Sequence, residues 1–101
     1  MLVQFTLSMP NRNSWNGEWS GENNLYARVR NLNKKDYKIL DELLEKGYYS
    51  YNFGDGWCAG VSIEKIDSKK ARQVRKNSKD FCNYDWMITS ILKDGYIHTL
   101  D

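Results

Sequence analysis

The 101-residue sequence is poor in the residues that most often build metal and redox sites: it has two cysteines, one histidine and one proline. Two cysteines are too few for a disulfide framework, and neither has a second ligand at zinc-binding spacing. We expect both, Cys58 and Cys82, to be small buried hydrophobic residues. Because His98 lies near the C-terminus, where chains fray, we expect no Cys–His catalytic pair.

Long hydrophobic runs and catalytic motifs are also lacking. No apolar run approaches the roughly 18 residues of a membrane span. The first nine residues alternate in polarity instead of forming a signal peptide, so we expect a cytoplasmic protein. A glycine-rich phosphate loop, an HExxH motif and a CxxC pair are missing. We therefore expect no cofactor, no metal and no enzymatic activity.

Aromatic side chains are plentiful and make up 14% of the residues. With 41% hydrophobic residues and a net charge of +2, the composition is that of neither a disordered chain nor a polyelectrolyte. A chain of this length buries roughly two thirds of its unfolded surface, enough for one core. We predict a single compact domain over residues 1–101.

The hydrophobic pattern predicts an α+β fold. The expected strands are residues 2–9, which Pro10 ends, 25–30, 48–53 and 57–66, with a loop over 10–24. The expected helices are 34–46, 68–77 and 84–94, and residues 96–100 form either a short edge strand or a tail. This ββαββαα order favours a four-stranded, mainly antiparallel sheet with the helices packed on one face.

The same alternation predicts the two faces of the sheet. The faces of Val3, Leu25 and Tyr49 should meet the helices. The faces of Gln4, Arg28 and Ser62 should form the open side. In the hairpin over 48–66, Tyr51 should pair with Ala59, and Tyr49 with Val61.

Positive charge is concentrated in residues 65–79, which hold seven basic residues against Asp67 alone. Lys69 and Lys70 fall at the start of the expected helix, where cations oppose its dipole. The segment is either a solvated helix face or a contact for nucleic-acid phosphate, a nucleotide or an acidic protein. Four of the cations fall within about 80° of one another if the helix reaches Lys79: Lys69, Arg72, Lys76 and Lys79. The predicted basic ridge over 68–79 consists of Lys69, Arg72, Arg75, Lys76 and Lys79.

Three tryptophans lie away from the expected core. Trp15 and Trp19 belong to the predicted loop, which either folds back over both rings or offers them to a partner. Trp86 falls on the outer side of helix 84–94. It either packs on helix 68–77 or the connector around Cys82, or is a partner contact, and a homodimer is one such arrangement.

The predicted open face of the sheet is a further candidate. Rings beside guanidinium groups suit a planar anion such as a nucleotide, although an ordinary solvated face has the same composition. The residues expected to line it are Tyr26, Arg28, Arg30, Tyr48 and Asn52.

In size and composition the whole chain resembles small proteins of phages and other mobile elements, of the anti-CRISPR and nucleotide-sponge kinds. The segments WNGEWSG, NFGDGW and NYDW stand out as the kind of sequence that marks a family. The resemblance implies a non-enzymatic binding protein that inhibits a host-defence component by occupying a macromolecular surface, with a protein as the first expected partner. Two alternatives are a nucleotide- or cyclic-nucleotide-sequestering protein and sequence-independent nucleic-acid binding through the basic helix.

Overall fold

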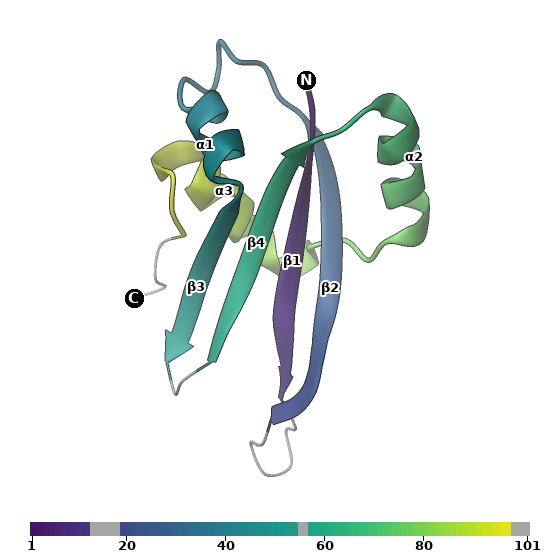
Figure 1. Ribbon diagram of the computed structural model, residues 1–101, viewed down its shortest axis with the longest axis vertical. Helices are drawn as coiled ribbons and strands as arrows, with labels where there is room; N and C mark the ends of the chain where they lie inside the picture. The colour runs from purple at the N-terminus through teal and green to yellow at the C-terminus, as the bar shows by residue number, and fades with distance from the viewer. Residues whose placement is uncertain (13–18, 55–56, 98–101) are drawn as a thin grey trace.

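The computed structural model describes residues 1–12, 19–54 and 57–97, which form one four-stranded sheet and three α-helices (Figure 1). The strands are β1 (Leu2–Arg12), β2 (Trp19–Asn31), β3 (Tyr48–Gly54) and β4 (Trp57–Lys65). The helices are α1 (Leu40–Lys46), α2 (Ser68–Asn77), the short 3₁₀ helix η1 (Cys82–Tyr84) and α3 (Asp85–Asp94). The sheet order is β2-β1-β4-β3 with every neighbouring pair antiparallel, so the predicted α+β class and ββαββαα order are confirmed. No helix in the described ranges is long and apolar enough to cross a membrane.

β1 is longer than predicted, because Pro10 lies inside the strand and pairing continues to Arg12. β1 pairs with β4 only as far as Ser8. Beyond that point β1 pairs with β2 alone, and a proline is tolerated where a strand has no neighbour on one side. The predictions that Pro10 ends the strand and that 10–24 is a loop are therefore wrong, since β2 already begins at Trp19.

One face of the sheet carries the main hydrophobic core. In β1 this face consists of the alternating apolar residues that the sequence predicted, and α1, η1 and α3 pack on it. The apolar residues of α3 that are buried here are Met87, Ile88, Ile91 and Leu92. The largest side chains in this core, each less than 2% exposed, are Phe5, Phe81, Leu7, Leu40, Met87, Ile88, Ile91, Val3 and Val61.

α2 packs on the opposite face of the sheet. Val29 of β2 pairs with Gln4, so both side chains point away from the Phe5 side of the sheet. There Val29 forms a second, small buried cluster with Ala71 and Val74 of α2. Figure 1 shows α2 beyond β2, apart from α1 and α3. The prediction that the helices pack on one face is therefore wrong for α2.

The two faces of β2 are consequently the reverse of the prediction. Leu25 and Ala27 lie on the α2 side, and Leu25 is 61% exposed. Arg28 lies on the core side, where it pairs with Phe5 across the ladder. The apolar alternation of β2 did mark a buried face, but that face belongs to the small cluster with α2 and not to the main core.

α1 begins at Leu40, later than the predicted start at residue 34. At the predicted start, the Asn33 side-chain oxygen accepts a hydrogen bond from the Lys35 N–H (3.0 Å) and stabilises a separate turn instead of a helix. Ile39 (φ −96°, ψ 9°) precedes the first helical residue. The predicted end is confirmed, because Gly47 has the left-handed conformation (φ 70°) that stops a helix.

The second hairpin and the later helices lie where the sequence predicted them. Tyr51 pairs with Ala59, and Tyr49 pairs with Val61. α2 has the predicted bounds, and α3 ends at Gly95 (φ 79°) as expected. Tyr84, which was predicted to begin α3, belongs to η1 instead.

Candidate functional site

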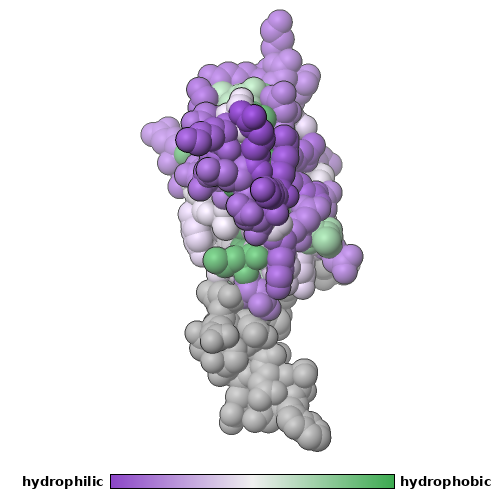
Figure 2. Space-filling view, turned by 90° about the vertical axis from the view of Figure 1, so that its right-hand side faces the viewer, coloured by the Kyte–Doolittle hydropathy of each residue, from purple (hydrophilic) through white to green (hydrophobic). Residues whose placement is uncertain are grey.

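The cations of α2 form an exposed surface that points away from the sheet. α2 turns Ala71 and Val74 toward β2, and both are buried. Every cation of the helix is exposed, and none makes an ion pair with a residue in the described ranges. Figure 2, which views this side of the molecule, shows hydrophilic side chains over most of it. We call this the basic surface; it consists of Lys69, Lys70, Arg72, Arg75 and Lys76.

Hydrogen bonds fix both ends of α2. At its start the Asp67 carboxylate accepts from the Lys70 N–H at 2.8 Å and caps the helix. At its end Ser78 is extended (ψ 149°), so Lys79 lies beyond the helix and its predicted alignment with the helical cations is wrong. The Lys79 carbonyl oxygen accepts from the Ala27 N–H at 2.7 Å. Lys79 therefore lies beside β2, at the edge of the sheet.

The fold itself does not require the charge on α2. The first turn of the helix contains two lysines, Lys69 and Lys70, and no acidic residue. Cations in that position cost a helix about 0.3–1 kcal/mol each. The small cluster under α2 is apolar, so it does not depend on whether the residues on the outer side of the helix are charged or neutral. The positive charge is therefore available to an external anion.

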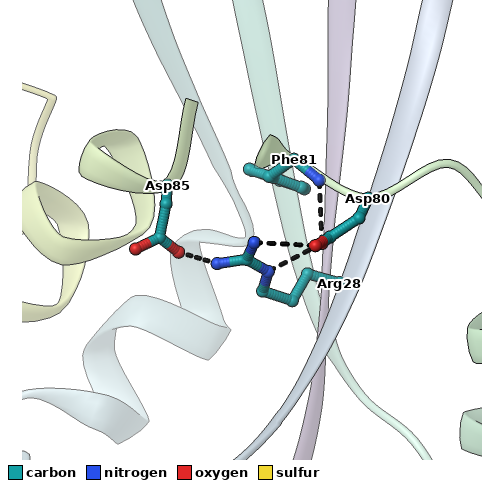
Figure 3. Close-up of polar contacts among 4 residues, drawn as sticks. All are labelled: Arg28, Asp80, Phe81 and Asp85. Carbon is teal, nitrogen blue, oxygen red and sulfur yellow. Dashed lines mark hydrogen bonds and ion pairs between the residues drawn. The ribbon is translucent and has the colours of Figure 1, made fainter. Parts of the chain in front are cut away.

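Arg28, predicted as a ligand-binding residue, is held by two carboxylates (Figure 3). Its Nε and Nη2 donate to the two carboxylate oxygens of Asp80 at 2.8 and 2.9 Å, and its Nη1 forms an ion pair with Asp85. Asp80 also accepts from the Phe81 N–H at 2.8 Å. The hydrogen bonds from Arg28 hold the pKa of Asp80 below its usual value, and those to Asp80 raise the pKa of Arg28. This cluster joins β2 to the start of α3, which is a structural role.

The five residues predicted to line one open face lie on two faces. In the β1–β2 ladder Tyr26, Arg28 and Arg30 pair with core residues, so they lie on the core side. Tyr48 and Asn52 lie on the opposite side. The predicted nucleotide site on the sheet therefore does not exist as one surface. The prediction of this site is wrong for the same reason as the predicted faces of β2, namely that α2 packs on the face opposite the main core.

The sheet face opposite the main core is covered by α2 over β2. The rest of this face, which we call the open face, carries exposed residues beside the half-buried Thr6 and Ser8 and the buried Gly60. On it Tyr48 is 57% exposed and lies against Gly60 of β4. A β-carbon at Gly60 would lie 2.2 Å from the Tyr48 hydroxyl oxygen and 2.8 Å from the adjoining ring carbon. Only glycine allows the ring to lie against the strand in this way. The open face consists of Thr6, Ser8, Leu25, Tyr48, Ser50, Asn52, Cys58, Gly60, Ser62 and Glu64.

A groove of about 360 Å³ separates the end of α2 from the open face. Gln4 and Thr6 lie on its sheet side, and Ser78 and Lys79 lie on its helix side. The Gln4 Nε2 donates to Thr6 Oγ1 at 3.0 Å, whereas the buried Gln4 Oε1 has no partner among the described residues. A buried acceptor without a partner costs about 1–3 kcal/mol. The groove thus favours a ligand that brings a hydrogen-bond donor.

The tryptophan predictions have different outcomes. Trp86 is partly buried, and its ring lies edge-on to Tyr51 of β3 with the centroids 5.2 Å apart. It therefore packs on β3, and α2, one of the two contacts that the sequence suggested, lies on the opposite face of the sheet. Trp15 lies outside the described residues, as does the side chain of Trp19, whose backbone pairs with Arg12.

The prediction that both cysteines are buried is wrong. Cys58 is exposed on the open face, and Cys82 is exposed in η1 with a positive φ of 47°. Strand alternation places Cys58 beside Gly60 on the polar side of β4, which the hairpin register had already indicated. Within the described ranges no cluster of three or more Cys, His, Asp or Glu side chains could hold a metal ion.

A second cavity, of about 510 Å³, opens on the core side between β2, the turn before α1 and α3. Three cations, Arg30, Lys38 and Lys93, line it together with Tyr37 and Asp36. Small-molecule sites commonly have volumes of about 300–1,000 Å³. Cations beside an aromatic residue suit a phosphorylated aromatic ligand. Arg30 thus lines a cavity, though with neighbours other than those predicted.

Comparison with protein-family models, curated proteins and solved structures found no match to this chain.

Proposed function

We propose that this is a non-enzymatic binding protein that holds the phosphate backbone of a nucleic acid with the basic surface of α2. The observation that carries the proposal is that every cation of this helix is exposed and makes no ion pair within the described residues. Unpaired cations on one element attract a polyanion, and contacts to phosphate bind without regard to sequence.

The distribution of the cations favours nucleic acid over the other two anionic partners. From Lys69 to Lys76 they extend about 10 Å along the helix axis, which suits a row of phosphates better than one compact phosphate group. Protein interfaces centre on apolar or aromatic anchors. The only apolar residues of α2, Ala71 and Val74, face the sheet, so its outer side offers no such anchor.

Charge reversal tests the proposal. A Lys69→Glu, Arg72→Glu, Lys76→Glu variant should lose affinity for a labelled oligonucleotide in a fluorescence-anisotropy titration. For the wild type, the logarithm of the binding constant should fall with the logarithm of salt concentration by about 0.7–0.9 per phosphate contacted.

The matched control reverses Lys34, Lys35 and Lys38 to Glu, which gives the same net charge. Lys34 pairs with Asp41 at 3.0 Å, but both side chains are more than half exposed, so the loss of stability is small. The control should bind far better than the α2 variant. Binding insensitive to salt, or an equal loss in both variants, would overturn the proposal.

The cavity beside Arg30 supports a second candidate function, the binding of a nucleotide. A thermal-shift screen with mono-, di- and cyclic nucleotides tests it. A nucleotide at 100 times its dissociation constant should stabilise the protein by about 2.7 kcal/mol. Arg30→Ala should remove that shift while Lys35→Ala, outside the cavity, keeps it. A panel that gives no shift would reject this candidate.

Inhibition of a host-defence component is a proposal about what such binding would accomplish, and it rests on the resemblance to phage-encoded proteins. Its test is expression in a bacterium with an active defence system, followed by phage challenge. Restored phage growth that depends on the basic surface supports it, and unchanged immunity counts against it.

A further inference from the structure

We propose that Tyr48 stacks on an unpaired base, so that the nucleic acid bound by this protein is single-stranded. The inference rests on the proposed function, because it names the kind of nucleic acid that the basic surface takes. Two observations carry it: the support of the Tyr48 ring by Gly60, and the position of that ring on the side of the sheet that also carries α2.

The Tyr48 ring is supported on one side and exposed on the other. Its hydroxyl end lies where a side chain of residue 60 would otherwise stand, and the residue remains 57% exposed. A ring held against a strand is already ordered before a ligand arrives, so little freedom is lost on binding. Bases stack readily on such rings, and stacking is tolerant of sequence.

A continuous row of paired residues joins the ring to the basic surface. Tyr48 pairs with Ser62, Ser62 pairs with Thr6, and Thr6 pairs with Ala27. Directly paired residues share a face of the sheet, and three strand spacings amount to about 14 Å. The Ala27 N–H donates to the carbonyl oxygen of Lys79, so the row ends at the cation that follows α2 in the chain. A strand whose phosphates run from Lys79 onto the cations of α2 can therefore extend its bases over the sheet toward Tyr48.

The sheet surface between Tyr48 and Lys79 is suited to contact bases. Thr6 and Ser62 are small and carry hydroxyl groups, and the unpartnered Gln4 amide oxygen borders the groove at the α2 end. Glu64 is the one carboxylate of the described open face, and it lies beyond Ser62, outside the row. A duplex stacks its bases on one another and cannot offer a base face to the ring, whereas a single strand can.

The test compares a single-stranded thymine oligonucleotide of about 15 nucleotides with a duplex of the same length. Tyr48→Leu, which removes the ring, should weaken single-strand binding by about 5- to 150-fold, the range for loss of one stacking contact. Tyr48→Phe keeps the ring and should bind like the wild type. Tyr96→Leu removes a ring that is equally exposed (54%) but lies after α3, and should also bind like the wild type.

The outcomes separate this inference from the proposed function. If the α2 charge reversal weakens binding and Tyr48→Leu does not, the basic surface stands and the stacking inference is overturned. If neither variant changes binding, both fail. A preference for duplex in the wild type also overturns the inference, whatever the variants show.

Alkylation footprinting of the wild-type protein keeps the inference testable if the Tyr48→Leu variant folds poorly. The two cysteines of the sequence are exposed on opposite sides of the sheet. Cys58 is the open-face neighbour of Gly60 along β4, and the Tyr48 ring lies over Gly60, so a base stacked on that ring stands near Cys58. Cys82 lies in η1 on the core side. Adding the thymine oligonucleotide should slow iodoacetamide alkylation of Cys58 and leave Cys82 unchanged, as mass spectrometry would show. Equal rates at Cys58 with and without the oligonucleotide contradict the inference.

Discussion

Arg28 of β2 binds both carboxylate oxygens of Asp80, at 2.8 and 2.9 Å, across 52 positions of the chain. The pair fixes the segment that passes from α2, on one face of the sheet, to η1 and α3 on the other. Asp80 is 57% exposed, so we expect a contribution in the range of exposed ion pairs, about 0.2–1 kcal/mol.

The Arg28–Asp80 pair predicts a pH-dependent part of the stability. Because the folded pKa of Asp80 lies below its unfolded value near 3.8, the contribution is present above pH 3.8 and is lost as the pH falls through the folded pKa. Asp80→Asn should therefore be less stable than the wild type at pH 7, and the difference should shrink at about pH 2. Urea unfolding at the two pH values measures it. Asp36→Asn, at an exposed position, should give little difference at either pH; a wild-type advantage over Asp80→Asn that persists in acid would contradict the account.

The contact between Tyr48 and Gly60 predicts a strong coupling between the two positions. Gly60→Ala should displace the ring, because the new β-carbon would overlap its hydroxyl end. That end belongs to an exposed side chain that can move aside, so the cost in the wild type should not exceed about 1 kcal/mol. In a Tyr48→Ala background the same change should be neutral or stabilising by up to about 1 kcal/mol, because alanine restricts the unfolded chain. A double-mutant cycle from urea unfolding gives the coupling, and strictly additive effects would rule the contact out.

The elements that the sequence predicted best are those specified by local signals. The bounds of α2 follow from the capping residue Asp67 and from the helical spacing of Ala71 and Val74 among charged residues. The register of the β3–β4 hairpin follows from its short turn, and that register already placed Tyr48 and Gly60 on one face. The basic surface was predictable for the same reason, because it belongs to a single helix.

The errors concern features that depend on distant parts of the chain. Alternation in β2 shows that the strand has an apolar and a polar face, but it cannot show that α2 covers the apolar one. Arg28 looked like a residue of an exposed face because its partners, Asp80 and Asp85, lie more than fifty positions away. Pro10 predicts a strand end from the sequence, which does not reveal that β4 stops pairing with β1 before this residue.

The cap of α2 predicts a measurable electrostatic contribution. Asp67→Ala should cost about 0.5–2 kcal/mol, since it removes the acceptor for the Lys70 N–H. For a domain of about 100 residues each 1 kcal/mol lowers Tm by roughly 4–8 °C. Asp67→Asn keeps an acceptor but loses the negative charge at the start of a helix whose first turn has no acidic residue. Its stability should therefore lie between those of the wild type and Asp67→Ala, and approach the wild type in high salt. An alanine variant as stable as the wild type would show that the cap is not needed.

The separation of the two buried clusters predicts that α2 can detach while the sheet stays folded. Val74→Asp places a charge in the small cluster of Val29 and Ala71, which the main core does not share. Hydrogen exchange should then accelerate throughout α2 and remain slow in β1 and β4, because locally weak units open without global unfolding. Gln73→Asp introduces the same charge at an exposed position of the same helix and should leave exchange in α2 nearly unchanged. If Val74→Asp instead exposes the central strands together with α2, the helix belongs to the cooperative core, and the basic surface could not move independently of the sheet.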